Sequence, residues 1–167
     1  MKRSQIVFFM TPILAIILCL ESVAEEKPWF DLENCAFCKN LSAEPGLVEH
    51  MCTEYHDLSN GVIAMTVIDE EYREAYQRAQ KNMQKVAEEW NKTGQTPYTC
   101  GFCSAYGEFM MAGVKFEPVH GEEAEVLLMT SDDPVMVEKL HAFGKRSTEE
   151  MAKARGARKV KKGKSDE

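Results

Sequence analysis

The chain carries one short cysteine motif, C-x-F-C, twice. The motif lies in the segments NCAFCKN and TCGFCSA, and its residues recur at a constant separation of 65 positions. The four motif cysteines are Cys35, Cys38, Cys100 and Cys103. Two residues between paired cysteines let both sulfurs face one point, and four thiolates suit a tetrahedral Zn²⁺ ion. We therefore predict a shared metal site, with zinc as the candidate ion.

The distance between the two motifs leaves alternatives open. The 61 residues between Cys38 and Cys100 far exceed the roughly 15 to 20 residues that separate the pairs of compact zinc sites. Each motif can instead form a local disulfide, or disulfides can join the two motifs. A thiol–disulfide redox role would need a stabilised thiolate, and Lys39 is the only cation adjacent to the first pair. A structural role remains the preferred interpretation.

A soft-metal carrier is a further hypothesis. His50, Met51 and Cys52 are consecutive, and Met110 and Met111 form a methionine pair. Imidazole, thiolate and thioether groups can bind copper(I). However, alternate residues of a strand face opposite sides, so one face cannot present all three consecutive residues. A buried, purely structural Cys52 is the simpler interpretation.

The sequence does not favour an enzyme. It contains no G-x-S-x-G, no H-E-x-x-H and no glycine-rich phosphate loop. The four histidines share no spacing that indicates a catalytic or metal-binding set. We interpret the protein as a binding or scaffold module whose ligand or partner the sequence does not identify.

Two β-hairpins, each followed by a helix, are predicted to position the cysteines. Residues 50–58 and 62–68 are strand-like and are joined by an Asn-Gly step that suits a tight turn. Residues 113–119 and 124–130 form the second predicted hairpin. An apolar stripe at helical spacing follows the first hairpin, from Tyr72 to Trp90.

The repeated features predict an internally duplicated hairpin-plus-helix unit. Besides the cysteines, Met65-Thr66 matches Met129-Thr130 at a separation of 64. The repeats would span residues 25–92 and 96–155 and pack together as one domain. The expected fold class is α+β: a four-stranded antiparallel sheet with two long helices on one face.

The N-terminus predicts export to the periplasm or secretion. Residues 1–24 show a basic start, a short apolar run and the small residues Ser22-Val23-Ala24, which is the pattern of a signal peptide. No later apolar run is long enough to predict a transmembrane segment in the mature chain.

The charge distribution argues against nucleic acid as a partner of the folded body. The whole chain carries −7, of which residues 1–24 contribute +1. Residues 153–167 hold seven Lys or Arg and two acids, so they carry +5 and leave −13 on residues 25–152. An acidic body of this kind repels nucleic acid and anionic lipid. Residues 156–167 are predicted to be a disordered basic tail.

Overall fold

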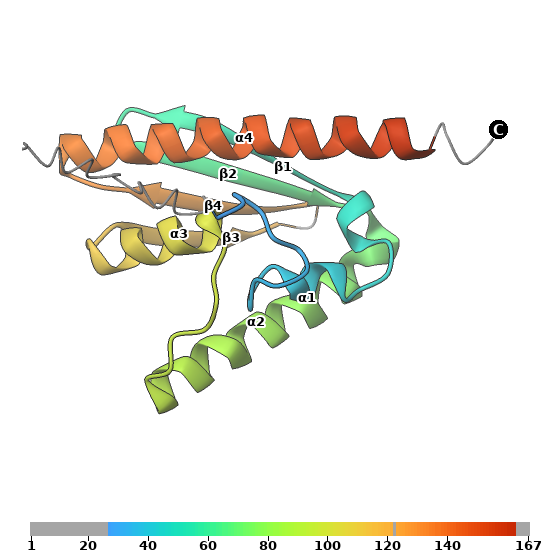
Figure 1. The fold of residues 1–167 in the computed structure, drawn as a ribbon. Helices are drawn as coiled ribbons and strands as arrows, with labels where there is room; N and C mark the ends of the chain where they lie inside the picture. Colours follow the sequence, from blue (N-terminus) through green and yellow to red (C-terminus); the bar gives the residue numbers. More distant parts are fainter. Residues whose placement is uncertain (1–26, 122, 163–167) are drawn as a thin grey trace, which may run out of the picture.

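A computed structural model describes residues 27–121 and 123–162. Within these ranges the protein is a mixed α+β structure with one four-stranded antiparallel sheet and four α-helices (Figure 1). In chain order the elements are α1 (Lys39–Ser42), β1 (Met51–Leu58), β2 (Gly61–Ile68), α2 (Arg73–Thr93), α3 (Gly101–Met111), β3 (Lys115–His120), β4 (Ala124–Thr130) and α4 (Pro134–Lys162). Short 3₁₀ turns at Leu47–Glu49 and Glu70–Tyr72 flank the first hairpin.

The sheet is built from the two predicted hairpins. The strand order is β1-β2-β4-β3, so β2 and β4 pair in the centre and β1 and β3 form the edges. Leu58 pairs with Gly61, which leaves Ser59 and Asn60 as a two-residue turn. A Cβ atom at Gly61 would lie 2.0 Å from the carbonyl oxygen of Met129, so only glycine fits at this close approach of β2 to β4. The four predicted strands are confirmed.

The pairing register divides the sheet into two faces. The inner face carries Tyr55, Val62, Ala64, Thr66, Phe116, Glu125, Leu127 and Met129. The outer face carries Cys52, Ile63, Met65, Val67, Glu117, Val119, Val126 and Leu128. Met129 is only 1% exposed, whereas Met65 is 37% exposed. The core of the protein therefore lies against the inner face.

This register corrects the predicted match of Met65 with Met129. A separation of 64 residues places the two methionines on opposite faces, because a shift of one residue along a strand exchanges its faces. Met65 therefore does not belong to the core. A separation of 65 residues instead relates Val62 to Leu127 and Ala64 to Met129, which share the inner face. The cysteines recur at the same separation.

Helix α4 lies along the inner face, over β1 and β2 (Figure 1). Close packing is possible at Gly144, where an added Cβ would be 3.0 Å from a methyl group of Val62 and 3.3 Å from Cβ of Tyr55. His141 Nε2 lies 2.9 Å from the carbonyl oxygens of both Leu58 and Gly61. Helix α4 therefore contacts the first hairpin along its strands and at its turn.

Helix α2 does not lie along the sheet as α4 does. Its N-terminal half contributes Ala79 to a small cluster with Leu47 and Ile68, and α1 lies beside it. Figure 1 shows the rest of α2 running away from the strands. The prediction of two long helices on one face of the sheet is thus not confirmed.

Helix α3 is an element that the sequence analysis did not predict. Its Phe109 belongs to the main core, and the Phe109 and Phe143 rings meet edge to face with centroids 5.3 Å apart. Helix α3 therefore occupies the inner face next to α4, where the second long helix was expected.

Pro28 and Trp29, near the start of the described residues, contact the same core. Trp29 donates a hydrogen bond from Nε1 to the buried Ser147 Oγ at 3.2 Å, and the guanidinium of Arg146 lies 4.3 Å from its ring centroid. The backbone amides of Gly101 and Phe102 bond to the carbonyl oxygens of Pro28 and Trp29. The start of α3 is thereby fixed to this segment.

The predictions for the two ends of the chain, a signal segment and a disordered basic tail, fall wholly or partly outside the described residues. The signal segment 1–24 lies outside them. Helix α4 extends to Lys162, into the predicted basic tail, and residues 163–167 lie outside the described residues. None of the described helices is long and apolar enough to cross a membrane.

Candidate metal centre

The two C-x-F-C motifs lie at the starts of α1 and α3. Cys38 immediately precedes α1 and Cys100 immediately precedes α3. In each motif the amide after the second cysteine bonds to the carbonyl oxygen of the first: Lys39 N to Cys35 O at 3.1 Å, and Ser104 N to Cys100 O at 2.9 Å. The motifs thus share one local backbone arrangement, which turns both sulfurs of a pair the same way.

The fold brings all four predicted ligands together. The Sγ atoms of Cys35, Cys38, Cys100 and Cys103 all lie within 4.8 Å of one another. Cys38 Sγ is 3.4 Å from Cys103 Sγ and 3.6 Å from Cys100 Sγ, so sulfurs of the two motifs are in direct contact. Four sulfurs about 2.3 Å from a tetrahedral zinc would be about 3.8 Å apart. The predicted convergence is confirmed, and the spacing fits a single ion.

The two segments that carry the motifs are joined beside the cysteines. The amide of Ala36 donates to the carbonyl oxygen of Tyr98 at 2.9 Å. The hydroxyl groups of Thr99 and Ser104 bond to each other at 2.8 Å across the second motif. The Ala36–Tyr98 bond joins the two segments through the backbone, and the Thr99–Ser104 bond stabilises the second motif itself.

The cysteine cluster is shielded from solvent. Cys35 and Cys100 are fully buried, Cys38 is nearly so, and Cys103 is half-buried. Apolar side chains from both motifs and the preceding segment surround the sulfurs; these are Leu32, Phe37 and Phe102. An apolar shell lowers the local dielectric constant and so strengthens the attraction between thiolates and a cation.

The four thiols do not form disulfides in this structure. The alternative of two local disulfides, Cys35–Cys38 and Cys100–Cys103, is therefore not seen. The sulfurs instead contact one another as thiols, and the Cys38–Cys103 distance of 3.4 Å is far longer than a disulfide bond of about 2.05 Å.

Hydrogen bonds among the thiols shift their pKa values in two directions: two of the values are lowered and two are raised. The bond with Cys100 lowers the pKa of Cys35, and the bond with Cys103 lowers the pKa of Cys100 to about 6. The pKa values of Cys38 and Cys103 are raised, chiefly by their hydrogen bonds with Cys100. Deprotonating all four requires a cation among them, because thiolates at this distance repel one another.

The residues of the copper hypothesis are not gathered in one place. Met51 packs against the cluster around Leu47 and Ile68 on the inner side, whereas Cys52 lies on the outer face. Met110 and Met111 are 61% and 83% exposed at the end of α3. The structure thus offers no single site for these residues.

The histidines occupy separate places in the fold. His50 Nδ1 is 2.7 Å from a carboxylate oxygen of Asp69, and its ring stacks on Tyr72. His120 pairs with Glu125, and His141 bonds to the turn of the first hairpin. Each of these three rings has a local structural partner.

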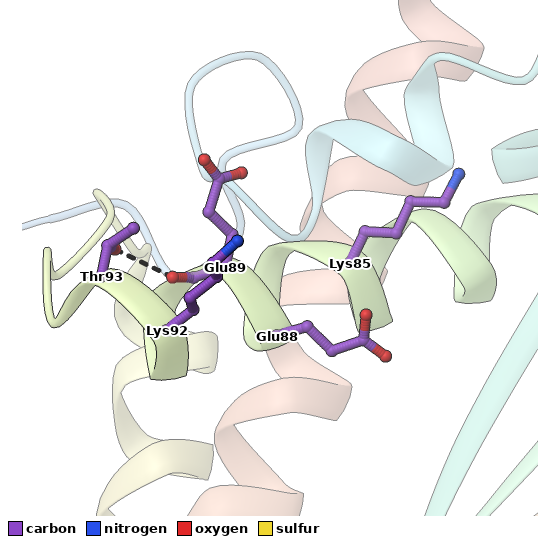
Figure 2. Close-up of a pocket in the computed structure, with 5 residues that line it drawn as sticks. All are labelled: Lys85, Glu88, Glu89, Lys92 and Thr93. Atoms are coloured by element: carbon purple, nitrogen blue, oxygen red, sulfur yellow. Dashed lines mark hydrogen bonds between the residues drawn. The ribbon is translucent and has the colours of Figure 1, made fainter.

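A hollow on α2 has no features of a binding site. Figure 2 shows that it is formed by Lys85, Glu88, Glu89, Lys92 and Thr93. It measures about 320 Å³, and all five residues are exposed. The Thr93 hydroxyl donates to the Glu89 carbonyl oxygen at 2.8 Å, which is a contact within the helix. Exposed charges of this kind are solvated by water and do not form a fixed set of ligand contacts.

No family model matches the chain, and neither the curated proteins nor the solved structures include a significant match. Function must therefore be inferred from the cysteine centre and its surroundings.

Proposed function

We propose that this protein is an exported binding or scaffold module in which one structural zinc ion joins the two C-x-F-C motifs. The observation that carries the proposal is the convergence of four mostly buried cysteine sulfurs within 4.8 Å. Four sulfur ligands, an apolar shell and the absence of an open coordination position are typical of structural zinc sites. The ion would neutralise the thiolates and join α1 to α3.

Zinc is favoured over copper by the number and arrangement of the sulfurs. Tetrahedral sites with four sulfur ligands favour zinc or iron, and copper(I) carriers require ligands from which the ion can leave. Here three of the four sulfurs are buried. A buried site of this kind retains its ion and so suits a structural role better than a transfer role.

The thiol–disulfide hypothesis is less well supported. A redox motif exchanges a bond between its own two cysteines. Here Cys38 Sγ contacts Cys103 Sγ of the other motif at 3.4 Å, and all four sulfurs lie within 4.8 Å of one another. This arrangement suits one shared ion better than an exchange confined to a single pair.

The proposal includes the internal duplication. Equivalent positions at a separation of 65 residues include the four cysteines and the inner-face pairs Val62/Leu127 and Ala64/Met129. The central pairing of β2 with β4 in antiparallel direction is what a twofold relation between two hairpins requires. The halves have diverged, since α3 has 11 residues where α1 has four.

Export is proposed from the sequence of residues 1–24 alone. Cleavage after Ala24 would give a mature chain that begins at Glu25, just before the described residues. N-terminal sequencing of the protein from an exporting host tests this. A chain that begins at Met1, or that stays with the membrane fraction, would contradict it.

Metal analysis of the purified mature chain tests the zinc proposal. We expect one zinc per chain and four thiols that react only after the ion is chelated. Cys103→Ser should reduce the zinc content at least tenfold, whereas Cys52→Ser, on the outer face, should leave it unchanged. A metal-free chain lighter by four hydrogens would instead support two disulfides, and retained copper would support the carrier.

A further inference from the structure

A large apolar cavity lies between the inner face of the sheet and the helices. It measures about 500 Å³. Ala64 and Leu127 form part of its floor, Tyr106 and Phe143 line it from α3 and α4, and Met83 lines it from α2. Sites for small molecules commonly occupy about 300 to 1,000 Å³ and are mostly apolar. The cavity is thus large enough for a ligand of drug-like size.

The charge in the cavity lining is confined to one pair of residues. Glu125 and His120 lie opposite each other on β4 and β3, and His120 Nδ1 is 2.5 Å from a Glu125 carboxylate oxygen. Among the side chains that the structure describes, the lining contains neither lysine nor arginine. The Glu125 side chain is mostly shielded, whereas that of His120 is largely exposed. Within this described lining the Glu125 carboxylate has no permanent cation beside it.

Tyr76 lies close to this carboxylate, and Tyr106 lines the same cavity. Burial raises the pKa of Tyr76, and the nearby charge of Glu125 raises it further. Burial likewise raises the pKa of Tyr106, and Tyr76 raises it further. Aromatic faces attract cations, most strongly where water is excluded. One part of the cavity thus combines a carboxylate with aromatic rings, a combination that recognises a cation.

Another part of the lining belongs to the cysteine centre. Cys38 lines the cavity, as does Phe102, which lies between Cys100 and Cys103. The ring of Phe102 stacks on Phe143 with centroids 5.0 Å apart. The centre consequently positions one aromatic wall of the cavity.

We propose that this cavity binds an apolar small molecule bearing a primary amine, with the amine beside Glu125 and the apolar part between the sheet and the helices. This inference rests on the proposed function as a binding module and names the class of its ligand. It does not depend on which ion the cysteines hold.

Fluorescence of N-phenyl-1-naphthylamine, a probe that brightens in apolar surroundings, tests whether the cavity binds. We expect saturable binding to the metal-loaded mature chain. Thr66→Phe fills the cavity from the inner face and should weaken binding at least tenfold. Its matched control is Val67→Phe, the adjacent residue on the outer face, which should bind like the wild type. Equal binding by Thr66→Phe and the wild type would overturn the proposal.

A second variant tests the cavity in case Thr66→Phe does not fold. Gln80 lines the cavity from the exposed surface of α2, so Gln80→Trp narrows the cavity without changing the sheet. It should weaken probe binding while the circular dichroism spectrum stays unchanged. Unchanged binding in this folded variant would also overturn the proposal.

Displacement of the probe tests the amine. Dodecylamine and dodecanoate have equal chain lengths and opposite charges, and both are used below the concentrations at which they form micelles. Dodecylamine should displace the probe at a concentration at least tenfold lower. Glu125→Gln should abolish most of this difference. Glu117→Gln removes the same charge from the outer face and should preserve it, which separates the cavity from the general negative charge of the body.

The outcomes distinguish this inference from the zinc proposal. Zinc content is measured on every sample, so a chain that holds zinc but shows no saturable probe binding disproves the cavity inference alone. Equal displacement by dodecanoate and dodecylamine disproves the inference that the ligand of the cavity bears an amine. A chain that binds the amine but contains no zinc disproves the metal proposal and leaves the cavity inference standing.

Discussion

At Gly61 the backbones of β2 and β4 approach so closely that no side chain fits. An added Cβ would lie 2.0 Å from the Met129 carbonyl oxygen. We predict that Gly61→Ala reduces the free energy of unfolding by about 1 to 3 kcal/mol, because either β4 or the Met129 carbonyl group must move to make room for the added methyl group. Gly107→Ala is the matched control, since nothing lies within 4 Å of its added Cβ in α3. It should stabilise the protein by about 0.5 to 1 kcal/mol in urea titrations. Equal effects would contradict the strand register.

Tyr55 makes stability depend on alkaline pH. Burial raises the pKa of this tyrosine well above its ordinary value of about 10. Below pH 10 the tyrosine is protonated in both folded and unfolded chains, so stability is unaffected. Above pH 10 the unfolded chain loses the proton first, and stability falls by up to about 1.4 kcal/mol per pH unit.

We predict that Tyr55→Phe reduces this alkaline loss. Unfolding free energies at pH 8 and pH 11 should differ by about 1.4 kcal/mol less in the variant than in the wild type. Taking the difference between two pH values removes the cost of the lost hydroxyl contact with Ser147. An unchanged difference would mean that Tyr55 ionises freely in the folded protein.

Among the elements, α4 is joined to the turn of the first hairpin by the imidazole of His141, in addition to its packing along the strands. His141 Nε2 lies 2.9 Å from two carbonyl oxygens that flank the β1–β2 turn. Replacing His141 by Ala leaves both oxygens without this donor, which should cost about 1 to 3 kcal/mol. Hydrogen exchange should rise at the turn amides in this variant. His120→Ala, at an exposed edge, is the control and should leave exchange at that turn unchanged.

The C-terminal half of α2 should contribute less to stability than its apolar stripe indicates. Trp90 is half-buried and lies on the part of the helix that runs away from the sheet (Figure 1). We predict that Trp90→Ala costs less than the 3 to 5 kcal/mol typical of a fully buried tryptophan. Thermal unfolding measures this. A loss within that range would show that Trp90 is fully packed in solution.

Regular periodicity made most elements predictable. Alternating β-branched residues and the Asn-Gly step identified the first hairpin, and the stripe from Tyr72 identified α2. Helix α3 was missed because its segment GFCSAYGEFMM begins with a cysteine motif and contains two glycines, which weaken a helical pattern. Its course depends on contacts with the distant Trp29 and Phe143, which no local pattern encodes.

For the whole molecule, the repeat separation made the cysteine site predictable. Equal spacing within both motifs indicated that they meet, and they do. The match of Met65 to Met129 failed because sequence similarity does not define which face of a strand a residue occupies. The cavity was not predicted, since its lining comes from residues scattered from Phe30 to Ala154.

Removing the ion should loosen the molecule as a whole. A ligand present at a hundredfold excess over its dissociation constant stabilises the folded state by about 2.7 kcal/mol. Chelation under reducing conditions should therefore lower the melting temperature by at least about 5 °C. Cys103→Ser should show no further decrease on chelation. A wild-type chain that melts identically with and without chelator would contradict a structural ion.

An ion held by both motifs would also act on the unfolded chain, as a cross-link. It closes a loop over the 61 residues between Cys38 and Cys100, and this loop contains β1, β2 and α2. Closing a loop of that length removes chain entropy worth about 4 kcal/mol, by the relation used for disulfides. The ion joins the segments that begin α1 and α3, since Cys38 precedes α1 and Cys100 precedes α3. A chain that keeps its ion while unfolded would therefore begin refolding with these two segments already in contact, whereas the apoprotein would first have to bring them together.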